Sequence, residues 1–167
     1  MNFTKFFLFS AVVAVLAGCS GYQLGSTLPE DVQSVFLRVV NNTDEPSIEV
    51  AVMKALRAEV QMDGRLKLRS ENEADLMLEV TLNGYQLAAL AYDRRRGSLA
   101  REYRTVLQAS SVLTRSETGE VILENPTLVG DADFTYDDDL TSAKLRILSE
   151  ASEDLARKVV SRVTTAW

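Results

Sequence analysis

The sequence predicts an α/β chain of the α+β sandwich type, with elements in the order β-α-β-β-β-α. Residues 74–82 alternate apolar and polar side chains, which is typical of a strand covered on one face only. Residues 48–60 carry apolar side chains at helical spacing. Residues 100–136 contain strand-like runs joined by a short turn. We therefore expect a four-stranded mixed, largely antiparallel sheet with two helices packed on one face.

The first predicted strand covers residues 32–40, which are rich in β-branched and aromatic side chains. The segment NNTDEP then ends it, and Pro46 suits the first turn of the following helix. Gly64 supplies the stop signal of that helix. Residues 66–68 are a weaker strand candidate. A helical crossover allows the first strand to pair in parallel with a later one.

Residues 74–82 are the clearest strand, with leucine and valine on one face and mostly polar side chains on the other. Gly84 interrupts the alternation, so we expect a bulge there. Strands over residues 100–114 and 121–136 follow, the second interrupted near Pro126. Because short turns join these late strands, we expect them to form an antiparallel meander.

The last element is a helix that runs to the C-terminus from Thr141 or Ser142, either of which suits its N-cap. An apolar stripe follows its helical period: Leu148, Ala151, Leu155, Val159 and Val163. We expect the stripe to cover the apolar sheet face, and the other face to be polar and either wet or covered by a partner. Trp167 is interpreted as a core residue rather than a partner contact.

The first residues are typical of an export signal. Lys5 precedes an apolar run over residues 6–16, which is too short to cross a bilayer comfortably. The tetrad LAGC at residues 16–19 resembles the lipobox of bacterial lipoproteins, in which the peptidase cuts before the cysteine and the sulfur carries the lipid. The alternatives are a core helix, or a plain secretory signal with an incidental cysteine.

Lipidation at Cys19 would divide the chain into three parts. We expect a lipoprotein signal peptide over residues 1–18, a lipidated N-terminus and tether over 19–30, and one domain over 31–167. Ser20 follows the cysteine, whereas an aspartate there would favour retention in the inner membrane. The expected location is therefore the periplasmic side of the outer membrane, with the protein anchored by several acyl chains.

The composition argues against most catalytic classes. The 167 residues include no histidine and one cysteine, and the net charge is −6. The usual general base and the commonest zinc ligand are therefore missing, and no glycine-rich phosphate cradle is present. Net negative charge argues against nucleic acid as a partner. We expect a non-catalytic protein without cofactor or metal, and a hydrolase that uses carboxylates alone is the least favoured alternative.

The densest acidic cluster comprises Asp131, Asp133 and residues 137–139. One interpretation is a calcium site, because hard cations take several oxygen ligands, but the spacing lacks the glycine and glutamate of an EF-hand. The favoured interpretation places Asp131 and Asp133 on the solvent side of a strand. Residues 137–139 then precede a helix N-terminus, where negative charge is stabilising.

Arg94, Arg95 and Arg96 are three adjacent guanidinium groups in an acidic chain, and Arg101 and Arg104 follow in the next strand. The planar guanidinium fork matches phosphate and carboxylate groups. One interpretation is a solvated hairpin tip, since charge runs are often merely solvated. The other is a ligand site made of these five arginines, directed at phosphorylated glycolipid.

Several segments together resemble the LptE family of lipopolysaccharide-assembly lipoproteins. The resemblance implies two helices on a four-stranded sheet and a role as a plug inside the LptD β-barrel. There the family helps the barrel assemble and helps load lipopolysaccharide into the outer leaflet, with basic residues as ligand contacts. The resemblance therefore implies that the five arginines meet either lipid A phosphates or the acidic inner wall of the barrel. The rival interpretations are an accessory lipoprotein of an ABC-type lipid transporter and a structural envelope lipoprotein. The resembling segments are GCSGYQLGSTLP, NNTDEPSIEVAVMKALRAEVQMDGRLKL, ADLMLEVTLNGYQ, EYRTVLQASSVLTRSETGEVI and ILSEASEDLARKVVSRVTTAW.

Overall fold

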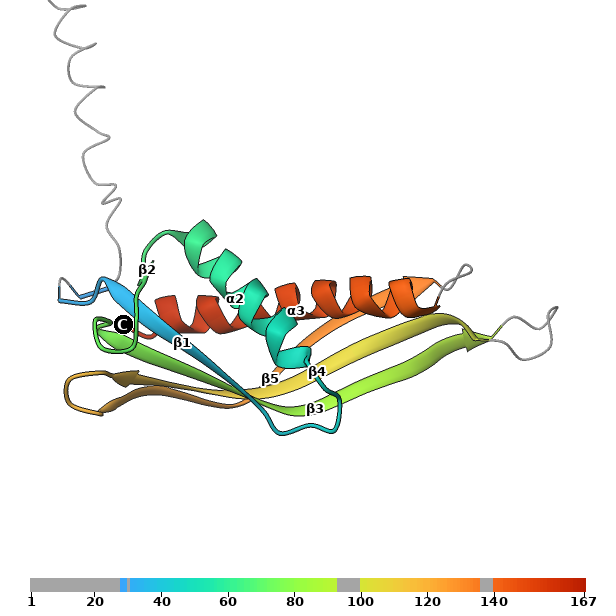
Figure 1. Cartoon of the computed structure of the whole chain (residues 1–167), viewed down its shortest axis with the longest axis horizontal. Helices are drawn as coiled ribbons and strands as arrows, with labels where there is room; N and C mark the ends of the chain where they lie inside the picture. Colours follow the sequence, from blue (N-terminus) through green and yellow to red (C-terminus); the bar gives the residue numbers. More distant parts are fainter. Residues whose placement is uncertain (1–27, 30, 93–99, 136–139) are drawn as a thin grey trace, which may run out of the picture.

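The computed structural model describes residues 28–29, 31–92, 100–135 and 140–167. Two helices lie on one face of a five-stranded sheet with the strand order β2-β1-β3-β4-β5 (Figure 1). The predicted class and the placement of both helices on one face are confirmed. The elements are β1 (Ser34–Asn41), α2 (Ile48–Asp63), β2 (Lys67–Leu68), β3 (Leu76–Tyr92), β4 (Ala100–Arg115), β5 (Val121–Thr135) and α3 (Leu140–Thr164).

The predicted count of four strands is too low by one, because β2 pairs in parallel with the start of β1. The Lys67 N–H donates to the Gln33 carbonyl at 2.8 Å, and the Arg69 N–H donates to the Val35 carbonyl at 3.2 Å. A strand of two residues is too short to show an alternation of its own. The sequence therefore indicated it only weakly.

The long strands pair as the sequence predicts. β1 runs parallel to β3, with Val35 opposite Leu76 at one end and Asn41 opposite Leu82 at the other. β3, β4 and β5 form an antiparallel meander. The register of β3 shifts between Leu82 and Gly84, which confirms the predicted bulge.

The core lies between the sheet and the helices. Leu76, Leu78, Val80 and Leu82 are 0–1% exposed, so the predicted apolar face of β3 is confirmed. The α3 stripe faces the same core, with four of its residues buried and Leu148 partly buried. Trp167 packs against this core as a partly buried side chain, as predicted.

Both helices begin at residues other than those predicted. α2 begins at Ile48, after Ser47 in the left-handed region with φ 65°, so Pro46 lies in the turn before the helix. α3 begins at Leu140, which places Thr141 and Ser142 inside the helix rather than at its N-cap. A cap preference of about 1 kcal/mol locates a helix start only to within a turn. Gly64, at φ 73°, ends α2 as predicted.

The two ends of the sheet are distinct (Figure 1). β1 begins, and the chain ends, at one end of the molecule, whereas β3 ends and β4 begins at the opposite end. β3 alone has 17 residues, a span of roughly 55 Å at the usual rise of a strand. In the parts of the chain that the structure describes, neither helix has the length and apolar character needed to cross a bilayer.

Candidate functional site

Arg104 is the one predicted ligand residue whose side chain is described. Cys19 and residues 94–96 lie outside the described residues. Arg101 belongs to β4, but its side chain is also outside them. The structure therefore locates Arg104 and leaves the other sites as predictions.

Arg104 is held by Asp133 on the neighbouring strand. Its Nε and one terminal nitrogen donate to the two carboxylate oxygens at 2.6 Å each, and Asp131 lies 4.0 Å from Nε. The hydrogen bond from Arg104 lowers the pKa of the Asp133 carboxyl, and the same bond raises the pKa of Arg104. An anionic ligand of Arg104 must therefore compete with Asp133.

A second charged group joins α3 to the edge of β5. The Lys158 ammonium donates to the Asp154 carboxylate at 2.6 Å and to the Val129 carbonyl at 2.7 Å. The Asp131 N–H donates to Asp154 at 3.2 Å. Partial burial raises the pKa of Asp154, but the hydrogen bonds from Lys158 and the Asp131 N–H outweigh it and leave the pKa below its ordinary value. Lys158 and Asp154 thus bind the Val129 carbonyl and the Asp131 N–H, which the edge strand β5 would otherwise expose.

The two aspartates on β5 face solvent, as predicted, with 40% of the Asp131 side chain and 48% of the Asp133 side chain exposed. Both are near cations, since Asp131 also lies 3.7 Å from the Lys158 ammonium. Within the described ranges no group of three or more acidic, histidine or cysteine side chains is arranged to hold a metal ion. Residues 137–139 lie outside those ranges.

The sheet face opposite the helices is uncovered in the described part of the chain (Figure 1). We call it the open face. It was predicted to be polar, but it carries both polar and apolar side chains. Valine, phenylalanine and methionine side chains lie among the polar ones. Its charges are largely paired: Arg38 lies 2.6 Å from Glu71 and 3.5 Å from Glu79. The register places these incompletely buried residues on it: Phe36, Val40, Met77, Thr81, Gln86, Val106, Gln108, Ser110, Val112 and Val129.

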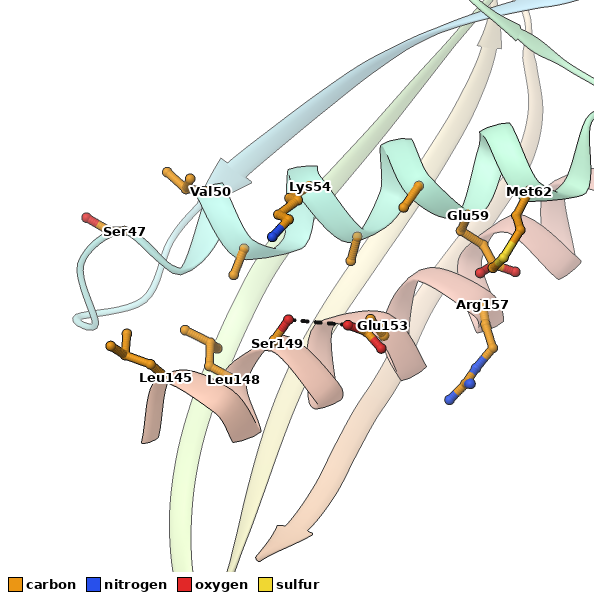
Figure 2. A pocket seen from close by; sticks show the side chains of 13 residues that line it. Ser47, Val50, Lys54, Glu59, Met62, Leu145, Leu148, Ser149, Glu153 and Arg157 are labelled. Carbon is orange, nitrogen blue, oxygen red and sulfur yellow. Dashed lines mark hydrogen bonds between the residues drawn. The ribbon is translucent and has the colours of Figure 1, made fainter. Parts of the chain in front are cut away.

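A second surface lies between the two helices on their outer side (Figure 2). This helix groove has a volume of about 660 Å³. Val50 and Met62 of α2 and Leu145 of α3 line it and are 64%, 76% and 68% exposed. Lys54 and Arg157 on its walls are balanced by acidic side chains, among them Glu153, which accepts a hydrogen bond from Ser149 at 3.3 Å.

The helix groove was not predicted from the sequence. The signal that could have found it is the apolar character of Val50 and Met62, which lie outside the buried stripe of α2. Exposed apolar side chains are informative only when they gather, and gathering across two helices is a tertiary property.

Comparison with known proteins identifies the family. The family model described as "LptE: Lipopolysaccharide-assembly" matches residues 32–163, from just before β1 to the last turn of α3. No curated protein matches the sequence.

Solved structures share the fold at low sequence identity. A protein from Xanthomonas campestris has a TM-score of 0.57 and 8% identity, covering 85% of this chain and 90% of its own. A minor lipoprotein from Acinetobacter baumannii has a TM-score of 0.50 and 17% identity, covering 79% and 90%. The PelC dodecamer from Paraburkholderia phytofirmans has a TM-score of 0.52 and 15% identity, covering 84% and 95%. Because the family match extends over the whole sheet and nearly all of both helices, the chain belongs to the LptE family of lipopolysaccharide-assembly proteins.

Proposed function

We propose that the protein is an outer-membrane lipoprotein, anchored through Cys19, that plugs and helps assemble an LptD-like β-barrel. In this complex it assists the insertion of lipopolysaccharide into the outer leaflet. The family match over residues 32–163 is the observation that carries the proposal. The fold supports it, because one sheet face is closed by helices and the other is free to contact a partner.

The described segments that adjoin the proposed anchor and the proposed ligand residues in the sequence lie at opposite ends of the molecule (Figure 1). Leu28 follows Cys19 by nine positions, so the tether is at most about 30 Å long. Leu28 and Val32 are buried, which fixes the base of the tether at the end where β1 begins. Residues 94–96 follow β3 in the sequence, and β3 ends at the other end of the sheet. An anchored body would therefore direct its arginines away from the inner leaflet.

The open face is the surface we assign to the barrel wall. A barrel wide enough to pass glycolipid needs its lumen filled, and the walls of such lumens are polar. The open face offers amides, hydroxyls and paired charges between its valines, so it can line a polar wall. The lipid anchor raises the local concentration of the plug near its barrel.

The ligand role is assigned to Arg94, Arg95 and Arg96, with Arg101 and Arg104 in support. Guanidinium groups bind phosphate oxygens in a bidentate manner, and lipid A carries phosphate. Reversal of the three charges at residues 94–96 should weaken binding to lipopolysaccharide micelles at low salt. Unchanged affinity would remove this role.

Affinity purification from native membranes tests the assignment. The tagged full chain should co-purify a large outer-membrane barrel, and depletion of the protein should trap new lipopolysaccharide short of the cell surface. A Cys19→Ser variant should co-purify less barrel, because the anchor is lost. Recovery of an inner-membrane ABC-type transporter instead would favour the accessory-lipoprotein alternative.

A further inference from the structure

The outer edge of β1 is only partly paired. β2 pairs with Ser34 and Val35 and then leaves the sheet. The Val35 carbonyl faces β2, so the alternation along the strand turns the backbone groups of Leu37 and Val39 to the same side. Within the described chain, no strand pairs with Leu37 or Val39 on that side. The backbone N–H and C=O groups of Leu37 and Val39 thus have no strand partner on this edge.

This edge is geometrically competent for strand addition, because β2 already uses it. Where β2 ends, a notch of about 380 Å³ opens beside these backbone groups. Phe36 and Leu37 of β1 and Leu68 of β2 line this notch, and Arg57 of α2 borders it. An extended backbone entering here would continue the sheet past the end of β2.

Helix α2 places opposite charges at the two ends of the free edge. Arg57 lies at the notch beside Leu37. Glu49 lies at the other end, where its carboxylate accepts a hydrogen bond from the Asn41 side chain at 3.0 Å. Arg57 follows Glu49 by eight positions, a rise of about 12 Å along the helix axis. The four residue-to-residue steps along β1 from Leu37 to Asn41 span about 13 Å.

We propose that the β1 edge receives an extended segment of a partner protein, added antiparallel to β1. The segment carries a basic residue beside Glu49, an apolar residue opposite Val39 and an acidic residue beside Arg57. One residue separates each member of this set from the next, so all three side chains lie on the same face of the added strand. Antiparallel pairing is slightly stronger per residue than parallel pairing. A second copy of this chain is disfavoured, because β1 itself offers Val35, Leu37 and Val39 on that face and no charge pair.

A labelled heptapeptide, TKTVTET, tests the proposal by fluorescence anisotropy with the full chain purified in detergent. In the antiparallel pairing, the N–H groups of its Lys, Val and Glu face β1. N-methylation of these three residues should abolish binding, whereas N-methylation of the two inner threonines should leave it unchanged. Hydrogen exchange at the Leu37 and Val39 amides should slow on addition of the unmethylated peptide.

Charge exchange on α2 gives the matched variants. The double variant Glu49→Lys/Arg57→Glu should reverse the preference from TKTVTET to TETVTKT, each exposed pair contributing about a two- to fivefold change in affinity. Lys54→Glu changes a charge on the same helix but lines the helix groove, so it should leave the preference intact. The proposal is overturned if no saturable binding appears up to millimolar peptide, if both methylated peptides bind equally, or if wild type does not distinguish the two sequences.

Discussion

Arg104 and Asp133 lie opposite each other on β4 and β5 and share two hydrogen bonds of 2.6 Å. The pair is on the open face, with 44% of the arginine side chain and 48% of the aspartate side chain exposed. Solvent screens an exposed pair, so its loss should cost little stability. Its main effect is to occupy the guanidinium fork that an anionic ligand would use.

Asp133→Asn should therefore strengthen binding to lipopolysaccharide micelles, because it removes the carboxylate that competes for Arg104. The increase should be about twofold at low salt and should shrink as salt is added. Asp31→Asn is the matched control, since it frees Arg115 from an equally short 2.6 Å pair elsewhere on the surface. An equal increase in both variants would show that net charge, and not Arg104, sets the affinity.

Gly130→Ala should destabilise the fold by about 1–3 kcal/mol, because α3 packs directly on the backbone of β5 at this point. An added Cβ atom would lie 2.5 Å from both the Ala151 carbonyl oxygen and the Leu155 Cβ. Urea unfolding measures the loss. Gly84→Ala is the control, since its nearest neighbour is the flexible end of Gln108 at 3.2 Å. Equal stability of the two variants would contradict the close approach of α3.

Asp75→Asn should lower the free energy of unfolding by about 1–2 kcal/mol at pH 7. Its carboxylate accepts hydrogen bonds from the Ser34 hydroxyl at 2.7 Å and from the Ser34 and Gln33 N–H groups at 2.9 and 3.0 Å. The hydroxyl bond is the largest of the causes that hold the pKa of Asp75 below its ordinary value.

The same residue predicts a pH dependence with a definite sign. Because its pKa is lower in the folded state, Asp75 stabilises the fold above its unfolded value of about 3.9. The contribution is lost as the pH falls through the folded pKa. The stability gap between wild type and Asp75→Asn should therefore narrow between about pH 5 and pH 2. A stability difference between wild type and Asp75→Asn that stays constant over that range would contradict this role of the Asp75 carboxylate. So would a similar stability difference between wild type and Glu117→Gln, a variant of an exposed residue.

Removal of the edge cover on β5 should promote self-association. In Asp154→Ala/Lys158→Ala, the Asp131 N–H and Val129 carbonyl lose their α3 partners, and an uncovered edge is a template for pairing. Light scattering should show concentration-dependent association, and the Asp131 amide should exchange faster. Arg146→Ala/Glu150→Ala removes a weaker pair of 3.9 Å on the same helix and should stay monomeric. Association of both variants would indicate a general loss of charge instead.

The sheet and its core could be predicted because each depends on local periodicity. The alternation at residues 76–82 and the stripe of α3 fixed which faces are buried, and Gly84 located the bulge. β2 was left out of the predicted strand count because two residues are too few to show a hydrophobic alternation. Its pairing also depends on the crossover that brings it beside β1. The helix groove and the free β1 edge also depend on elements distant in the sequence.

The candidate site was predictable only in part. The arginine pattern singled out Arg104, but its pairing with Asp133 depends on the register between β4 and β5. A shift of one residue would place the two side chains on opposite faces of the sheet. The open face was expected to be polar from β3 and β5, whereas Val106 and Val112 of β4 contribute apolar side chains to it.

Site-specific photo-crosslinking in the native host tests the central claim, that the open face contacts an outer-membrane barrel. A crosslinker at Gln108, an exposed position in the middle of the open face, should give an adduct with the barrel. A crosslinker at Met62 in the helix groove should give little or none. An adduct from Met62 alone, or one from Gln108 with an inner-membrane transporter, would contradict the account.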